Sequence, residues 1–572
     1  MKKHSKGSSR LFSLALILLF GGLGFARGGS ISGRVKEPSA AGPVPWASIT
    51  VNAADTGLLA GAASADALGN FSVAIPIPGK YLVLATQFGY LTMAAPEAIE
   101  LSDAAPDQTV DLALSKESPA PAPAPAPPAR TWGTGTGKSY LIPALEIPAF
   151  LTILSLYDRH AYPNQTEGGK KVYSSTVSST WYHIVHENWE VDQDPFAVNQ
   201  FEHPYQGAMF HGFARSAGLN YWQALLYDNY GSYLWKMGGE TDPPSINDQI
   251  ATGIAGSFFG EALFRMANLL FEEDEASSSF LRKLGGTLVL PSAGFNRYAY
   301  GDRFSSIFAS NDPATFAWLQ LGVGLQSNQN DQGVTSTGER DQAMATYCLA
   351  YGLPGKDGYT YTRPFDYFHF EFDLLANSSN TVDNVMIRGL LVGTDYYSGH
   401  TIDGIWGIYG GYDYISPYIF RVSSTSVSLG TTLQVRLGGS VVLQGSALGG
   451  IGYAAAGNTT PVGQRDYHYG LAPQVLGAMR LIFGNRAMLD ATGRYYDVTS
   501  SGGGDNLGGS ESVHRLNTGF TLRIFGHQAL GIQYIESLRS AHYSGLPSSH
   551  QSVGTVAVVY TMLGKTGFGA VK

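Results

Sequence analysis

The feature that most constrains the fold of this chain is an alternation of residue types in its C-terminal half. In the segment FDYFHFEFDLLA at 365–376, aromatic residues at every second position alternate with His369, Glu371 and Asp373. On a β-strand, successive residues point to opposite faces. An imidazole and two carboxylates on one face are costly in a sandwich core, whereas the polar lumen of a membrane barrel accommodates them. The alternation therefore favours a transmembrane β-barrel.

Comparable segments recur up to the C-terminus, at 314–328, 341–352, 383–397, 403–413, 432–455, 466–484, 486–498, 514–525, 528–541 and 551–562. With a further strand near 417–429, the count is about 12, an even number as in bacterial barrels. The predicted fold class is mainly β, with an antiparallel transmembrane β-barrel at 314–572. The tail GKTGFGAVK departs from the usual barrel ending, because no aromatic residue closes the chain.

The composition agrees with a membrane barrel. Charged residues are only 14% of the chain, which has 71 Gly and 33 Tyr, and each strand of a barrel shows only every second residue to lipid. The net charge of −9 without a basic block disfavours a nucleic-acid partner. The single Cys348 excludes an intramolecular disulfide framework, and we expect that no cysteine-based metal site is possible. We expect no metal and no cofactor.

The N-terminus predicts export. Lys2, Lys3 and Arg10 precede an apolar run at 11–20, and the small-x-small step at 24–26 suits signal peptidase. The apolar core is shorter than the ~20 residues that a membrane-spanning helix needs. We therefore expect a cleaved signal peptide at 1–26 and a protein of the bacterial outer membrane.

Residues 29–115 predict a small β-sandwich, because short alternating segments are separated by turn signals. The pieces SISGRV, GPVPWASITV, DALGNFSV and PGKYLVLATQFGY, in this order and spacing, resemble the carboxypeptidase regulatory-like (transthyretin-like) domain. The resemblance implies a binding or spacer module without catalytic residues. A Pro/Ala-rich linker at 116–130 follows, which predicts an extended, semi-rigid tether. We expect the sandwich in the periplasm, where it could bind a periplasmic or envelope protein.

A helical or plug region is expected at 131–313, ahead of the barrel. From about 205 to 270 apolar residues recur at three- and four-residue spacing, which indicates helices. Two small-x-x-x-small steps let helices approach closely: Gly256 with Gly260, and Ala208 with Gly212. The pattern predicts two or three short helices, packed against each other or inside the barrel.

The same region holds the densest group of polar residues. One interpretation is an active site with His203 or His211 as base and Asp248 or Glu261 as orienting acid, or a metal site from the same groups. The other, which we favour, is a buried network that locks the helices into the barrel mouth or lumen, since no H-E-x-x-H, G-x-S-x-G or Walker pattern is present. The full predicted cluster comprises Asn199, His203, Tyr205, Arg215, Asn247, Asp248, Glu261, Asp466 and His468.

A second enzymatic alternative rests on two short motifs. Some outer-membrane lipid hydrolases and deacylases keep a His-x-Ser pair on a barrel strand, with the His as base for the Ser. His542 with Ser544, and His550 with Ser552, have this spacing. Both pairs lie in a Ser-rich stretch that looks like a loop, where such spacing arises by chance.

Three longer motifs indicate a family. WEVDQDPFAVNQFEHPYQG, AGLNYWQALLYDNYGSYLWKMGGETDPPSINDQI and QRDYHYGLAPQVLGAMRLIFGNRAML resemble an uncharacterised bacterial outer-membrane family, domain of unknown function 3943, from Asn188 to the C-terminus. The resemblance implies a barrel with a helical segment and no established activity. We expect an integral outer-membrane protein in contact with lipid, with a non-enzymatic envelope, pore or anchoring role. The alternative is a lipid-modifying hydrolase with a His/acid site in the helical segment.

Overall fold

A computed structural model gives the fold of the chain, which forms two compact units at Met1–Ala122 and Pro123–Lys572. The predicted signal peptide at 1–26, the linker at 116–130 and Asp466 lie outside the described residues. The structure describes residues 29–38, 42–87, 90–102, 104–115, 138–167, 170–191, 194–272, 280–300, 310–331, 335–376, 381–399, 401–458, 467–500, 508–544 and 547–571.

The first unit is built from two small sheets around one core. One sheet has the order β4-β1-β8, with β9 also on β1, and the other has the order β3-β2-β5-β6, with β7 also on β5. Ile31 and Phe71 of the first sheet and Ile49 and Val83 of the second are buried in the same apolar cluster. The strands are β1 Gly29–Lys36, β2 Ser48–Ala53, β3 Leu59–Ser64, β4 Asn70–Ile75, β5 Gly79–Thr86, β6 Met93–Ala94, β7 Ile99–Leu101, β8 Asp107–Thr109 and β9 Leu112–Ala113.

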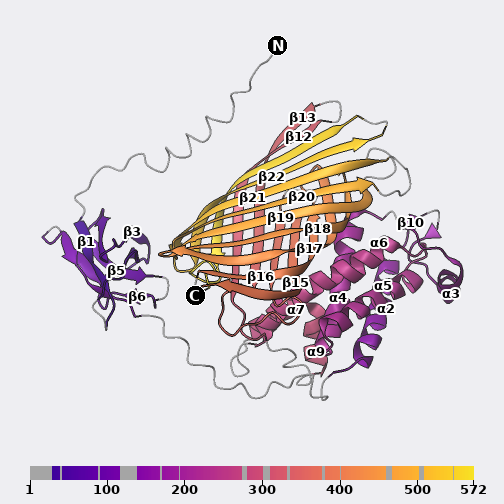
Figure 1. Cartoon of the computed structure of the whole chain (residues 1–572), viewed down its shortest axis with the longest axis horizontal. Helices are drawn as coiled ribbons and strands as arrows, with labels where there is room; N and C mark the ends of the chain where they lie inside the picture. The colour runs from indigo at the N-terminus through magenta and orange to yellow at the C-terminus, as the bar shows by residue number, and fades with distance from the viewer. Residues whose placement is uncertain are drawn as a thin grey trace, which may run out of the picture. The chain divides into compact units, whose positions relative to one another are not determined.

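The second unit contains a closed antiparallel barrel of 12 strands, in which each strand pairs with the next and β12 pairs with β23 (Figure 1). The predicted strand number is confirmed. The strand expected near 417–429 is β17, which continues to Gly438. The strands are β12 Thr315–Asp331, β13 Thr335–Tyr351, β14 Phe368–Leu375, β15 Val382–Ser398, β16 Ile402–Ile415, β17 Phe420–Gly438, β18 Val441–Asn458, β19 Tyr467–Phe483, β20 Ala487–Ser500, β21 Gly509–Phe525, β22 Gln528–Tyr543 and β23 Ser549–Leu563.

The barrel is apolar outside and polar inside. On β12, Leu321, Val323 and Leu325 are exposed on the outer surface, whereas Gln320 and Gln326 are buried in the interior. Exposed apolar side chains continue around the wall, for example on β23 and β22, and they form a belt with the composition that lipid requires. The period-two alternation in the sequence therefore arises because one face of each strand points outward and the other into the polar lumen, as expected.

The two ends of the barrel differ in their connections. At one end, turns of two or three residues join β15 to β16, β17 to β18, β19 to β20 and β21 to β22, and the long connection 352–367 joins β13 to β14. Each of these turns has a glycine with positive φ, a conformation that glycine adopts without strain: Gly399, Gly438 and Gly439, Gly484, and Gly526. The chain enters β12 and leaves β23 at this same end, since Trp318 pairs with Leu563.

The helices form a bundle in which α4 contacts α2, α5, α7 and α9. Asn220 caps α5 by accepting a hydrogen bond from the Gln223 backbone, and Pro204 lies in the first turn of α4. The helices are α2 Leu141–Ala161, α3 Val177–His186, η2 Val198–Glu202, α4 His203–Ser216, α5 Tyr221–Gly238, α6 Ile246–Asp248, η3 Gln249–Ala255, α7 Gly256–Glu272, α8 Phe280–Val289 and α9 Pro291–Tyr300, where η marks a π-helix. A short pair of strands, β10 Thr166–Glu167 and β11 Lys170–Lys171, accompanies them. Over 205–270 the helical segments are α4, α5 and the continuous run α6-η3-α7, which agrees with the two or three helices expected there, and α2, α3, α8 and α9 add to them outside this range.

The bundle packs against the outside of the barrel wall beside β15–β17 (Figure 1). The ring of Phe259 on α7 lies 6.3 Å from that of Phe370 and 5.9 Å from that of Tyr412. On β16, a Cβ added at Gly410 would meet the ring of Phe258 at 2.5 Å. Phe370, Tyr412 and Gly410 lie on the face opposite to the lumen. The expectation that the helices could lie inside the barrel is therefore wrong, because the aromatic wall residues that would face lipid face helices instead.

Among the described residues, α2 is long and apolar enough to cross a membrane, judged by length and composition alone.

Candidate functional site

The centre of the helical bundle is a carboxylate with four hydrogen bonds. Glu261 on α7 accepts two from Arg215 on α4, at 2.6 and 3.0 Å, and one from Arg265 at 2.8 Å. His211 Nε2 lies 3.1 Å from the same carboxylate. Burial acts to raise the pKa of Glu261, but Arg215, His211 and Arg265 outweigh it and hold this pKa well below its usual value. Glu261 is therefore a charged side chain without access to solvent.

His211 joins this carboxylate to a second one. Its Nδ1 lies 2.7 Å from Asp228 on α5, so both ring nitrogens are engaged. Burial acts to lower the pKa of His211, but Asp228 and Glu261 outweigh it and raise this pKa. Burial raises the pKa of Asp228 to about 7, against the opposing effect of His211. His211 thus bridges the two carboxylates inside the bundle.

The network continues from the helices to the barrel. Arg265 Nη1 donates to Asp366 at 2.9 Å, and its Nη2 donates to the carbonyl of Pro364 at 2.7 Å. Both acceptors belong to the connection between β13 and β14. Charge-assisted bonds of this kind hold two elements in one geometry. The buried charges of α4 and α7 thus attach the bundle to the barrel wall.

A second polar group lies around Asp248. His203 Nε2 is 3.4 Å from the Asp248 carboxylate. Lys236 on α5 bonds the same carboxylate, and it also donates to Glu240 at 2.6 Å. Asn247 donates to Asp248 at 3.0 Å. Its four side chains and the carboxylate are buried, so this group also belongs to the interior of the bundle.

Residues on or next to the two π-helices hydrogen-bond to tyrosines of the barrel. Asn199 on η2 donates to the hydroxyl of Tyr467 at 2.9 Å, and Asn247, just before η3, donates to that of Tyr469 at 3.0 Å. The hydroxyl of Tyr412 donates to the carbonyl of Gln200. These tyrosines lie at the ends of β16 and β19, on the outer face. They fix the bundle to the wall with directional bonds.

The structure brings the four candidate residues together as two pairs, His203 with Asp248 and His211 with Glu261. Arg215 joins the second pair. Tyr205 is partly exposed, with its ring 6.1 Å from that of Phe259. His468 belongs to the barrel instead, where its Nδ1 is 2.9 Å from the hydroxyl of Tyr543.

The chemical capacity of the His211 group is limited by its own bonds. Both oxygens of Glu261 and both nitrogens of His211 are engaged, and the two side chains are 0% exposed. A base must take a proton from a substrate group within hydrogen-bond reach, and here that would require the network to break. The arrangement suits a lock between helices better than acid–base catalysis.

The His-x-Ser motifs are not assembled as pairs. Among the described residues, His542 Nδ1 lies 2.9 Å from the hydroxyl of Ser548, and His550 Nδ1 lies 3.1 Å from that of Ser540. The serines at the motif spacing, Ser544 and Ser552, are thus not the hydrogen-bond partners of these rings. The geometry does not support them as base and nucleophile.

Ion pairs cross the barrel interior. Arg494 on β20 donates to Asp413 on β16 at 3.0 Å, and Arg388 bonds the same carboxylate. Arg515 on β21 bonds Asp383, just after the start of β15, at 2.5 Å. β20 and β16, like β21 and β15, are not neighbours in the sheet, so the Arg494 and Arg515 bridges run across the lumen, whereas Arg388 reaches Asp413 from the adjacent strand β15. Such side chains occupy the space that a channel would need.

The C-terminal tail covers the lumen at the short-turn end. Gln434 Nε2 donates to the carbonyl of Val571 at 2.8 Å, and Gln434 Oε1 accepts from the Val571 amide at 2.8 Å. Gln444 donates to the carbonyl of Gly569 at 2.7 Å, and Phe568 is fully buried. The tail that departs from the usual barrel ending thus folds back onto the interior. Phe568 and Gly569 both have positive φ, at 52° and 82°, where the tail turns.

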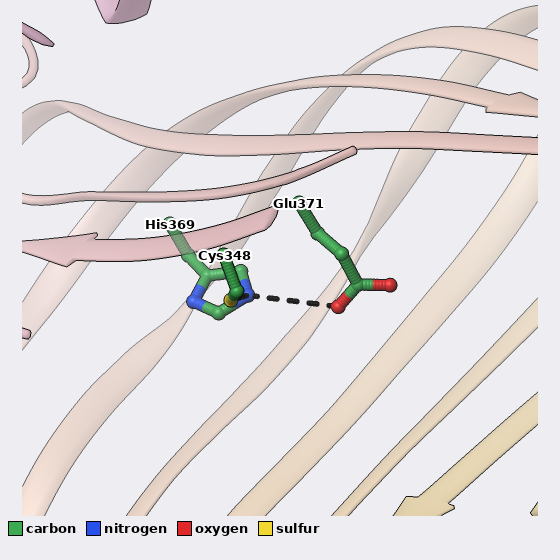
Figure 2. A group of neighbouring side chains, drawn as sticks. All are labelled: Cys348, His369 and Glu371. Atoms are coloured by element: carbon green, nitrogen blue, oxygen red, sulfur yellow. Dashed lines mark hydrogen bonds and ion pairs between the residues drawn. The ribbon is translucent and has the colours of Figure 1, made fainter. Parts of the chain in front are cut away.

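A third group of chemically active side chains lies inside the barrel. Cys348 on β13 lies beside His369 and Glu371 on β14, with one potential ligand atom from each within 4.8 Å of the others (Figure 2). Sequence reasoning took a single cysteine as an argument against a cysteine-containing site. The alternation placed His369 and Glu371 on one face, but the register that brings Cys348 to them is not visible in the sequence.

Two of these three residues, His369 and Glu371, border a small cavity inside the barrel. Its volume is about 70 Å³, and His369 and Glu371 contribute to its wall. Other side chains of the wall include Gln320, Thr346, Arg480 and Asp490. Apolar side chains such as Trp318 and Leu353 line the cavity as well.

These features define a class of protein. A closed antiparallel barrel with an even number of strands, an apolar outside and a polar inside is the architecture of integral proteins of the bacterial outer membrane.

Residues 188–292 match the family described as Domain of unknown function (DUF3943). The resemblance expected from Asn188 onward is confirmed over this range, which covers the helical bundle from η2 to the start of α9. No curated protein matches the chain in sequence.

Solved barrels resemble parts of the chain. The translocator domain of the autotransporter NalP from Neisseria meningitidis is 15% identical, over 43% of this chain and 88% of that chain, with a TM-score of 0.20. The P. putida toluene transporter TodX is 8% identical, over 44% and 91%, with a TM-score of 0.19. The NanC porin is 9% identical, over 41% and 98%, with a TM-score of 0.19. TM-scores this low carry no argument about this chain.

Proposed function

We propose that this chain is an integral outer-membrane protein whose closed barrel anchors a helical bundle on its outer wall. The observation that carries the proposal is the filled lumen. Ion pairs such as Arg494–Asp413 and Arg515–Asp383 cross it, and the C-terminal tail covers one end. Of the roles expected from the sequence, anchoring in the envelope fits this arrangement better than an open pore.

The size of the interior supports this choice. The cavity beside His369 and Glu371 measures about 70 Å³. A water molecule needs about 10–15 Å³ of such a volume, so this cavity holds only a few waters. A diffusion pore needs a continuous water-filled path between the two ends of the barrel. A pore role would require the tail and the ion pairs to move.

The orientation follows from the two ends of the barrel. In bacterial barrels, short turns face the periplasm and longer loops face outward. The chain enters β12 and leaves β23 at the short-turn end. The proposal therefore places this end, and the N-terminal sandwich, in the periplasm, after export through a cleaved signal peptide. The sandwich would be free there to bind an envelope protein.

Lipid contact is proposed for the barrel and for the bundle. On α8, Phe280, Leu281 and Leu288 are 76%, 72% and 71% exposed. Exposed apolar side chains of this size mark membrane or protein contacts. The bundle is attached to the barrel wall, and the rest of that wall carries the lipid-facing belt. We therefore propose that the exposed apolar side chains of the bundle contact lipid as well.

The hydrolase alternative is not favoured by a specific observation. His211 is hydrogen-bonded to Glu261 and His203 lies at ion-pair distance from Asp248, but both pairs are buried among other charges. They explain how the bundle holds together without invoking a substrate.

Conductance of the protein in planar bilayers tests the proposal. We expect no stable channel steps from the full-length protein, because side chains and the tail occupy the lumen. Heat-modifiable gel mobility of the same protein sample checks that the barrel is folded. An absence of current is then not caused by a protein that failed to insert.

A variant that lacks residues 566–572 is the matched control. It removes the tail but keeps the ion pairs, and we expect at most small, brief leaks from it. Stable porin-like conductance steps from the full-length protein would contradict a filled lumen. A protein that remains soluble and shows no heat-dependent shift would contradict the membrane location.

A further inference from the structure

We infer that Cys348, His369 and Glu371 form a binding site for a divalent transition-metal ion of the zinc class inside the barrel. The site is separate from the helical bundle. It goes beyond the anchoring role, which needs no metal.

The sheet register creates the site. Cys348 pairs directly with Glu371 across β13 and β14, and His369 precedes Glu371 by two residues, so the three side chains point to the same face. Figure 2 shows the Cys348 sulfur against the His369 ring, with the Glu371 carboxylate turned toward it. That face is the lumen, where His369 and Glu371 border the cavity.

The spacing of the donor atoms fits a single ion. Zn–S of about 2.3 Å and Zn–N of about 2.0–2.1 Å at a tetrahedral angle put sulfur and nitrogen about 3.6 Å apart. In the structure, Cys348 Sγ and His369 Nε2 are 3.4 Å apart. His369 Nε2 and Glu371 Oε2 are 4.0 Å apart, slightly more than the ~3.3 Å of a filled tetrahedron. A small rotation of the glutamate closes this difference.

The donor types select the metal. Thiolate, imidazole and carboxylate together suit Zn²⁺, whereas Mg²⁺ and Ca²⁺ take oxygen ligands. A thiolate and a carboxylate also balance the two charges of the ion. Three protein ligands leave the fourth tetrahedral position for a water molecule, and the adjoining cavity has room for one.

A neighbouring amide orients the carboxylate. Asn384 on β15 donates to Glu371 Oε1 at 2.8 Å, which leaves Oε2 turned toward His369. Asn384 in turn accepts from Arg494 at 2.7 Å, so its position is fixed by the ion pairs of the lumen. Outer partners of this kind hold metal ligands in place and strengthen binding.

Metal content measures the site directly. The full-length protein is refolded into detergent with ZnCl₂, dialysed, and analysed for zinc per chain, because the closed barrel would exclude metal added later. We expect about one zinc per chain. With Co²⁺ instead, we expect a thiolate-to-metal charge-transfer band and tetrahedral d–d bands.

Substitutions locate the ion. C348S, H369Q and E371Q should each weaken zinc binding at least about tenfold, and C348S should also abolish the charge-transfer band. N384A, which acts through Glu371, should weaken it about tenfold. H468Q is the matched control, since His468 is another barrel histidine, bonded to Tyr543. It should keep full zinc content.

Two results would overturn the site. One is a folded wild-type protein, with heat-modifiable mobility, that retains no more zinc than the three ligand variants. The other is equal loss of zinc in H468Q, which would place the metal elsewhere.

Discussion

At the scale of single residues, the structure depends on charges that compensate each other out of water. Glu261 neutralises Arg215 and shares Arg265 with Asp366. A buried ion pair contributes little compared with apolar packing, but removal of one partner leaves a buried charge uncompensated. Each member of this network is therefore more sensitive to substitution than an exposed charge.

Replacement of Glu261 by Gln should destabilise the helical bundle by about 3–5 kcal/mol, because Arg215 and Arg265 lose their common counter-charge. Denaturant unfolding in detergent, followed by helical circular dichroism, measures the change. Lys283→Gln, at an exposed position on α8, is the control and should change stability by less than about 0.5 kcal/mol. Equal behaviour of the two variants would show that the network is not needed for stability.

At the scale of elements, helix contacts depend on small residues. A Cβ at Gly256 would lie 2.7 Å from the Cα of Gly207, and one at Gly260 would lie 3.0 Å from the Cα of Ala208. The step from Gly256 to Gly260 thus packs on α4, as its spacing predicted. Gly212, expected in the second step, faces Ser292 and Leu290 at α9 instead.

Replacement of Gly256 by Ala should destabilise the bundle by about 1–3 kcal/mol, since the added methyl group meets backbone atoms that cannot yield easily. The comparison is Gly285→Ala on α8, where the nearest atom to the new Cβ would be 3.5 Å away. That variant should be neutral or slightly stabilising, by up to ~1 kcal/mol. Denaturant unfolding measures both variants. A loss of stability in Gly285→Ala as large as in Gly256→Ala would contradict the close contact of Gly256 with Gly207.

At the scale of the whole molecule, the sequence predicted the barrel and its 12 strands well, because the alternation reports which face of each strand is apolar. It did not predict where the helices lie. Phe370 and Tyr412 are apolar wall residues whether lipid or a helix covers them, so the pattern is the same in both cases. Packing between distant parts of the chain determines on which side of the barrel wall the helices lie, and the local periodicity of the sequence does not encode it.

The candidate site shows the same limit. The sequence pointed to His203, His211, Asp248 and Glu261, and the structure pairs them. It missed Asp228, which lies on α5 within one of the family motifs but was not singled out there, and the position of Cys348 beside Glu371. Both depend on how separate elements meet, and a single sequence does not contain that register.

Cross-linking tests most directly whether the bundle lies outside a closed barrel. In a C348S background, Phe258→Cys is combined either with Gly410→Cys on the outer face of β16 or with Ser426→Cys, a buried lumen position on β17. Isolated outer membranes are treated with a short thiol-reactive cross-linker, and linked peptides are identified by mass spectrometry. The account predicts a link to position 410 and none to 426. A link to 426 without one to 410 would place the helices in the lumen and contradict it.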